Sequence, residues 1–131
     1  ATHWVKRRIY GRKRDMGLVR QILFAIEDLP KQHNGFGDIK IDGRAAEEIN
    51  YHLMILIDAG LIKADFVTNK MTDYIWKSIR LTWDGHEFLD ASRDNKRWEK
   101  AKGVMAQAGG FALDVMKQLL IQYLKADLNL P

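Results

Sequence analysis

One stretch, residues 44–62 (RAAEEINYHLMILIDAGLI), limits most strongly what this chain can fold into. Its apolar residues recur at the spacing of one helical face, and they are Ile49, Leu53, Leu56 and Ile57. Gly60 predicts the end of this helix, because glycine adopts the left-handed conformation without a Cβ clash. An alternating run over 61–67 follows at once, and residues 75–82 read as its returning partner. The stretch therefore predicts a helix that passes directly into a β-hairpin.

The residues before this stretch predict another helix and another strand. Asp15 is a plausible N-cap for a helix that runs to about Leu29 and is ended by Pro30. Residues 38–42 (DIKID) alternate like a short edge strand. We therefore expect a mostly helical α+β fold: a winged-helix-like domain with a three-stranded antiparallel sheet and extra C-terminal helices. Its expected parts are a basic arm at 1–14, a core at 15–94 and C-terminal helices at 95–131.

The C-terminal part is predicted to be helical. Thr82 is a candidate N-cap, and the basic cluster 93–102 fits a helix that continues to about Gln107. A last helix over 111–128 is apolar around more than half of its girth, so it needs burial on more than one side. This predicts a homodimer or another protein partner. The predicted interface consists of Leu113, Met116, Leu120, Tyr123 and Leu124.

Positive charge is concentrated at the N-terminus. The net charge is +4, but residues 1–14 hold six basic residues and no acid, so the remaining body carries −2. Such a segment, with Trp4 and Tyr10 interleaved, fits an arm that contacts phosphates and stacks on bases. A solvated tail, a short leader and an added edge strand remain open alternatives.

Duplex DNA is the nucleic acid that we expect to be bound, if any is. The hairpin is mildly positive, and the cluster 93–102 is the best candidate in the body, although a solvated helix face is the favoured explanation of this cluster. The predicted nucleic-acid-binding residues are Lys6, Arg7, Arg8, Arg12, Lys13, Arg14, Lys70, Lys96, Arg97 and Lys100.

The helix before the hairpin does not have the charge of a DNA-recognition helix. Arg44 is its only cation, against Glu47, Glu48 and Asp58, and acidic side chains at a groove repel phosphates. A separate support helix has no room between Asp42 and this helix, so it is either compressed into one turn or missing. A scaffold helix with a solvated acidic face is the alternative to a recognition helix.

No constellation of residues predicts catalysis. The chain has no cysteine, and its histidines lack metal-ligand spacing, so we expect no metal and no cofactor. His52 lies beside the apolar stripe and fits a core histidine with a backbone partner. No apolar run is long enough to span a bilayer, so we expect no membrane contact and a cytoplasmic protein.

Four sequence blocks together resemble a bacterial and phage family known as domain of unknown function 2513. They are KRDMGLVRQIL (13–23), YHLMILIDAGLI (51–62), RLTWDGHEFLDASRD (80–94) and GGFALDVMKQL (109–119). The resemblance covers about residues 13–125 and implies a small winged-helix-like protein of phage or prophage type. It brings no catalytic or binding residues, and residues 1–12 lie outside it.

Two functions therefore compete. The first is a non-enzymatic DNA-binding accessory or regulatory protein. The second is a protein-interaction module, for example an inhibitor of a host complex, that uses the same scaffold without binding DNA. The basic arm favours the first function, and the acidic helix and the apolar last helix favour the second.

Overall fold

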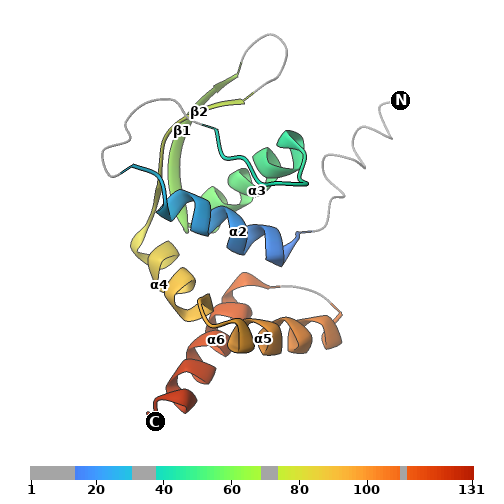
Figure 1. Ribbon diagram of the computed structural model, residues 1–131, viewed down its shortest axis with the longest axis vertical. Helices are drawn as coiled ribbons and strands as arrows, with labels where there is room; N and C mark the ends of the chain where they lie inside the picture. The colour runs from blue at the N-terminus through green and yellow to red at the C-terminus, as the bar shows by residue number, and fades with distance from the viewer. Residues whose placement is uncertain (1–13, 31–37, 69–73, 110–111) are drawn as a thin grey trace.

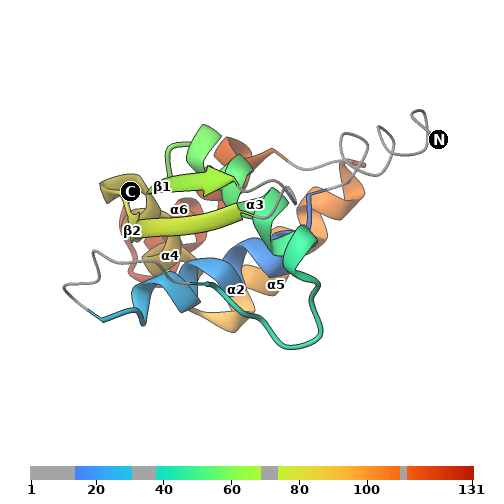
Figure 2. The same cartoon turned by 90° about the horizontal axis from the view of Figure 1, so that it is seen from above.

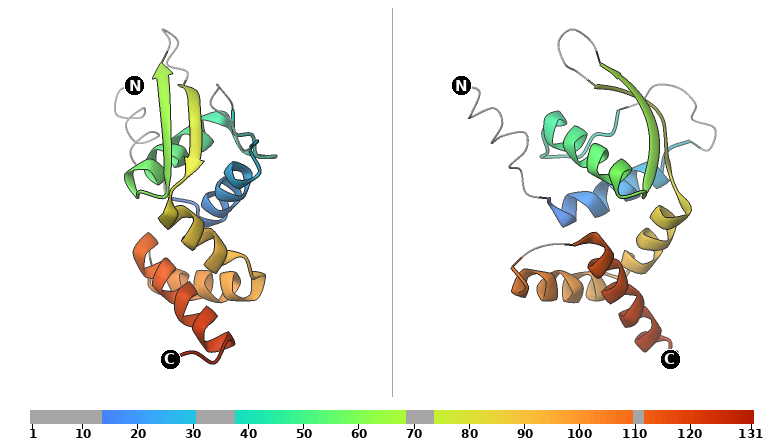
Figure 3. Two further views of the ribbon diagram at one scale, coloured as in Figure 1. Left: turned by 90° about the vertical axis from the view of Figure 1, so that its left-hand side faces the viewer. Right: turned by 180° about the vertical axis from the view of Figure 1, so that it is seen from behind.

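The computed structural model describes residues 14–30, 38–68, 74–109 and 112–131, which form five α-helices and one two-stranded antiparallel sheet (Figure 1). The elements are α2 (Met16–Glu27), α3 (Ala46–Asp58), β1 (Ile62–Thr68), β2 (Tyr74–Leu81), α4 (Trp83–Ser92), α5 (Asn95–Gln107) and α6 (Leu113–Asp127). The hairpin, α2 and α3 lie at one end of the molecule, and α5 and α6 lie at the other (Figures 1 and 3). Helix α4 leads from β2 to the second group. The predicted mostly helical α+β class is confirmed.

Helix α2 lies at the centre of the core. Asp15 caps it as predicted, since its carboxylate accepts a hydrogen bond from the Leu18 N–H at 3.1 Å. Leu18, Ile22 and Leu23 are fully buried, and each contributes on the order of 1.5–3 kcal/mol through burial. They belong to one continuous cluster with side chains from every other helix and from the hairpin. The C-terminal helices therefore share a core with the N-terminal half.

The end of α3 follows the prediction made from Gly60. Gly60 has a φ of 77°, and its N–H donates to the Ile57 carbonyl while the Leu61 N–H donates to the Leu56 carbonyl, both at 3.0 Å. This double hydrogen bond is a Schellman motif, which closes the helix and turns the chain into β1. Gly60 is thus needed for its left-handed backbone.

The start of α4 is tied to the same turn. Thr82 caps α4 as predicted by accepting from the Gly85 N–H, and its hydroxyl donates to the Gly60 carbonyl at 2.6 Å. A Cβ on Gly85 would lie 2.0 Å from the Leu61 carbonyl oxygen, so only glycine allows this close approach. The beginning and the end of the hairpin are consequently fixed to each other (Figure 2).

The predicted strand at 38–42 is wrong, and the sheet of the described residues has two strands instead of three. Ile39 is buried, but the Ile41 carbonyl accepts from the Arg44 N–H at 3.1 Å and closes a turn in which Gly43 has a φ of 78°. The alternation of Ile39 and Ile41 thus reflects anchoring in the core. The same turn leads directly into α3, so the separate support helix is missing from residues 38–45.

Candidate nucleic-acid interface

The two faces of the hairpin have different surroundings. On the inner face, Trp76 is buried and its indole N–H donates to the Asn50 carbonyl oxygen of α3 at 2.8 Å. Phe66 and Tyr74 pack around Trp76 with ring centroids 5.2 and 5.7 Å from it. The inner face is therefore fastened to α3. No described element covers the outer face (Figure 3).

A β-bulge decides which side chains reach the outer face. Lys63 pairs with Arg80 and Asp65 pairs with Lys77, so β2 has one more residue than β1 between these pairs. Ser78 lies in this bulge and has a left-handed backbone conformation with a φ of 57°. Because side chains alternate along a strand, this insertion turns Ile79 into the core and Arg80 outward. Without the bulge their positions would be exchanged.

The outer face consequently carries an excess of positive charge. Lys63 and Arg80 are directly opposite each other and exposed, whereas Asp65 faces Lys77. Like charges in directly opposite positions destabilise a sheet. Arg80 also donates one hydrogen bond to the Ser78 carbonyl at 3.0 Å. The Lys63–Arg80 pair was not among our predicted contact residues, because the bulge that creates it has no glycine or asparagine to mark it.

Two apolar residues continue this face toward the loop. Val67 and Ile75 are paired across the strands, and they are 54% and 38% exposed. Lys70, which we predicted to contact DNA, follows in a segment outside the described residues. We call the exposed set Lys63, Asp65, Val67, Ile75, Lys77 and Arg80 the outer hairpin face, on which the carboxylate of Asp65 lies opposite Lys77.

The surface of α3 has the opposite charge. Arg44 forms ion pairs with Asp15 at 2.8 Å and with Glu48 at 3.2 Å, so the only cation predicted for this helix is engaged. Partial burial raises the pKa of Asp15, but the hydrogen bonds from Arg44 and the Leu18 N–H outweigh it and leave that pKa below its ordinary value. Glu47 and Asp58 are exposed on the same helix.

His52 is a core histidine, as predicted, and it joins α2 to α3. It is 1% exposed, and its Nε2 accepts from the Asp15 N–H at 2.9 Å. The proton therefore lies on Nδ1, which donates to the Glu48 carbonyl at 2.9 Å. The ring thus has two backbone partners. Within the described ranges, no group of three histidine, aspartate or glutamate side chains is placed to hold a metal ion.

The predicted contacts on α5 serve packing against α6 and α4. Arg97 forms an ion pair with Asp127 at 3.2 Å and donates to the Ala91 carbonyl, and its side chain is 15% exposed. The Lys100 ammonium lies 4.2 Å above the ring of Tyr123. Of the three predicted residues in this cluster, Lys96 and Lys100 are exposed and Arg97 is half-buried. The cluster therefore offers less charge to a ligand than its sequence indicates.

Arg93, at the start of the same cluster, belongs to a second network. It forms ion pairs with Glu27 and Asp90, and the hydrogen bond from Arg93 lowers the pKa of Glu27. Arg20 lies nearby and donates to the Ser92 and Arg93 carbonyls at 2.9 Å. Its guanidinium also lies 5.2 Å from the ring centres of both Phe24 and Trp98. Arginines therefore fix the junction between α4 and α5.

The predicted partner interface on α6 needs correction. Met116 and Leu120 are fully buried in the chain's own core, because this stripe of α6 faces α4 and α5. Leu113, Tyr123 and Leu124 are half-buried, and Val115 is 45% exposed. A dimer through α6 stays a prediction, and of its predicted residues Leu113, Tyr123 and Leu124 are partly accessible.

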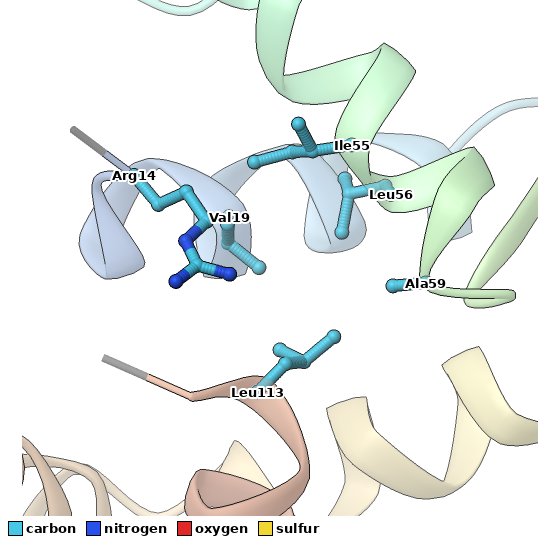
Figure 4. Close-up of a pocket in the computed structure, with 6 residues that line it drawn as sticks. All are labelled: Arg14, Val19, Ile55, Leu56, Ala59 and Leu113. Carbon is cyan, nitrogen blue, oxygen red and sulfur yellow. The ribbon is translucent and has the colours of Figure 1, made fainter. Parts of the chain in front are cut away.

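Arg14 is the only predicted arm residue that the structure describes. It lines a small apolar cleft of about 60 Å³ together with Val19, Ile55, Leu56, Ala59 and Leu113 (Figure 4). Ligand sites measure roughly 300–1,000 Å³, so this cleft does not hold a metabolite. Lys6, Arg7, Arg8, Arg12 and Lys13 lie outside the described residues.

Comparison with known proteins identifies the family. The model of a family described as hypothetical protein (DUF2513) matches residues 13–111. The chain belongs to this family. A relative from Haemophilus influenzae, described as an uncharacterized protein, is 31% identical over 109 residues, which are 82% of this chain and 91% of the relative. No solved structure matches. Among the described helices, none is long and apolar enough to cross a membrane.

Proposed function

We propose that this DUF2513 protein is a non-enzymatic, winged-helix-like DNA-binding accessory or regulatory protein of phage or prophage type. The distribution of its cations carries the proposal. Six cations without an acid occupy residues 1–14, whereas most cations of the cluster 93–102 are engaged with neighbouring carboxylates and rings. The arm therefore supplies most of the positive charge that duplex DNA can meet.

The order of elements supports the winged-helix-like reading. A helix, a second helix, a hairpin and a further helix follow one another, and α3 ends at the hairpin as a recognition helix does. Among the described residues a separate support helix and a third strand are missing, and in this the chain differs from the usual pattern. DNA binding through the arm would be mainly electrostatic, because phosphate contacts dominate affinity and carry no direct sequence information.

The test compares the parent chain with a variant in which the arm cations are replaced by glutamine. Binding to a short mixed-sequence duplex is measured by fluorescence anisotropy from about 50 mM to about 200 mM salt. If all six cations engage phosphates, their contribution to the log–log salt slope is near −5, from about −0.9 per phosphate. We expect the variant to lose most of that slope and most of its affinity. A parent that fails to bind duplex DNA at low salt would refute the proposal.

A second function, a protein-interaction module on the same scaffold, is favoured by the surface of α3. This helix occupies the position of a recognition helix, yet Glu47, Glu48 and Asp58 give it a negative charge, and Arg44 is held by Asp15 and Glu48. Such a surface fits a basic protein better than a phosphate backbone. The same titration separates the two functions, because this module requires no affinity for duplex DNA.

A further inference from the structure

We propose that the outer hairpin face enters a groove of duplex DNA, as a two-stranded β-ribbon, and that α3 stays outside the groove. The inference rests on the proposed function. It assigns the DNA contact made outside the basic arm 1–14 to residues that the family resemblance does not mark. Lys63 and Arg80 would bind the phosphates that border the groove, and Val67 and Ile75 would pack against base edges.

The first argument is the unbalanced pair of cations. Lys63 and Arg80 occupy directly opposite positions, where like charges destabilise the sheet. The bulge at Ser78 creates this arrangement, since it turns Arg80 outward. A polyanion between the two side chains would remove the repulsion, and a phosphate backbone provides one. Arg80 keeps donors available beyond its single bond to the Ser78 carbonyl.

The second argument is size. Among the described residues the sheet consists of β1 and β2 alone, and neighbouring strands lie about 4.7–4.9 Å apart. The major groove is about 12 Å wide and admits a two-stranded ribbon. A ribbon with no described element over its outer face can approach the duplex directly (Figure 3).

The third argument is the separation of charge. Trp76 and its bond to Asn50 hold α3 against the inner face, so the sheet stands between the α3 carboxylates and the outer hairpin face. Docking α3 in the groove would place Glu47 and Asp58 near phosphates, which repel them. Docking the outer face places Val67 and Ile75 where apolar side chains contact thymine methyl groups.

The experiment uses the full chain and two double variants that each remove two positive charges. Lys63→Ala with Arg80→Ala changes the outer hairpin face, and Lys40→Ala with Lys125→Ala changes exposed cations before α3 and on α6 as the matched control. Affinity for a short mixed-sequence duplex is measured across salt concentration. The hairpin variant should bind roughly 30-fold more weakly at about 0.15 M salt, with a slope smaller by about 2, from 0.9 per phosphate. The log–log salt slope of the control variant should differ from that of the parent by no more than about 0.5, well below the change of about 0.9 expected for one phosphate contact.

A single variant excludes a folding defect as the cause. Lys63→Glu places opposite charges across the strands, so its melting temperature should equal or exceed that of the parent while its affinity for DNA falls. Val67→Ser with Ile75→Ser should weaken binding without changing the salt slope, because these residues carry no charge.

The outcomes that contradict the proposal are distinct from failure of the proposed function. If the parent binds duplex DNA and the hairpin variant binds as tightly as the control, the arm alone makes the contact and the hairpin proposal is overturned. Tighter binding to a single strand than to the duplex would overturn the groove contact. If the parent binds polyglutamate but not DNA, and the hairpin variant no longer binds polyglutamate, the outer hairpin face is a contact site for an acidic protein. A parent with no affinity for duplex DNA refutes the proposed function itself.

Discussion

The helix α5 and the hairpin are both rich in cations, but their cations have different surroundings. On α5, Arg97 and Lys100 contact Asp127 and the Tyr123 ring, and they hold α6 in place. On the hairpin, Lys63 faces Arg80 across the strands. The longer cluster of cations therefore serves the fold, whereas the shorter set stays directed at solvent. The number of cations in a segment does not tell how many of them a ligand can reach.

The largest expected effect tests the structural role of α5. Trp98 is 2% exposed and packs its ring against Phe88 and the guanidinium of Arg20. Trp98→Ala should lower the free energy of unfolding by about 3–5 kcal/mol, as large aromatic truncations in cores do. Trp83, which is 77% exposed, provides the matched control. Its replacement by alanine should change stability by about 0.5 kcal/mol or less in urea unfolding. Equal losses in the two variants would contradict the placement of α5 in the core.

A smaller loss is expected at the junction between α4 and α5. Arg20→Ala leaves the Ser92 and Arg93 carbonyls without their donor and should cost about 1–3 kcal/mol. Arg20→Lys is the informative companion, because a lysine keeps the charge but not the planar set of donors. It should recover little of the loss in thermal melting. If Arg20→Lys recovered the full stability of the parent, the positive charge alone, and not the planar set of guanidinium donors, would fix the junction.

Local signals in the sequence predicted the helix ends well. Asp15, Gly60 and Thr82 act through neighbours within a few positions, so their roles as caps and as a left-handed turn could be deduced from residue type. Contacts between residues that are distant in the sequence could not be deduced in this way. The partners of Arg97 and Arg93, Asp127 and Glu27, are 30 and 66 positions away.

The sheet and the candidate interface show the same limit. Ile39 and Ile41 alternate as in a strand, but strand formation depends on a partner that the alternation does not specify. The position of Arg80 depends on a bulge at a serine, a residue type that does not mark left-handed backbone. The excess charge of the arm could be counted directly from the sequence. The pairing of Lys63 with Arg80 could be deduced only once the register of the hairpin was known.

Two adjacent cations on α5 sharpen the comparison between engaged and exposed charge. Arg97→Ala removes an ion pair with Asp127, a bond to the Ala91 carbonyl and a largely buried stem, and it should cost about 0.5–1.5 kcal/mol. Lys96→Ala should stay within about 0.5 kcal/mol, as exposed substitutions do. Denaturant unfolding of both variants measures the difference. A loss at Lys96 as large as at Arg97 would contradict the distinction between them.

The smallest expected effect concerns pH and the Glu27–Arg93 pair. The hydrogen bond from Arg93 depresses the pKa of Glu27 in the folded chain, so the folded state binds its proton less readily than the unfolded state does. A depressed carboxyl pKa contributes stability that is present above the unfolded value, near 4.3, and is lost as the pH falls through the folded value. Because the Arg93 side chain is 43% exposed, solvent screening limits the contribution to about 0.2–1 kcal/mol. Glu27→Gln should therefore reduce stability at pH 7 by that amount, and its stability should fall less steeply than that of the parent between about pH 5 and pH 3.

The matched control is Glu99→Gln, since the Lys102 ammonium lies 3.7 Å from the Glu99 carboxylate in an exposed ion pair. This variant should leave the pH dependence of stability nearly unchanged. Equal profiles for Glu27→Gln and the parent would mean that Arg93 is held by Asp90 alone.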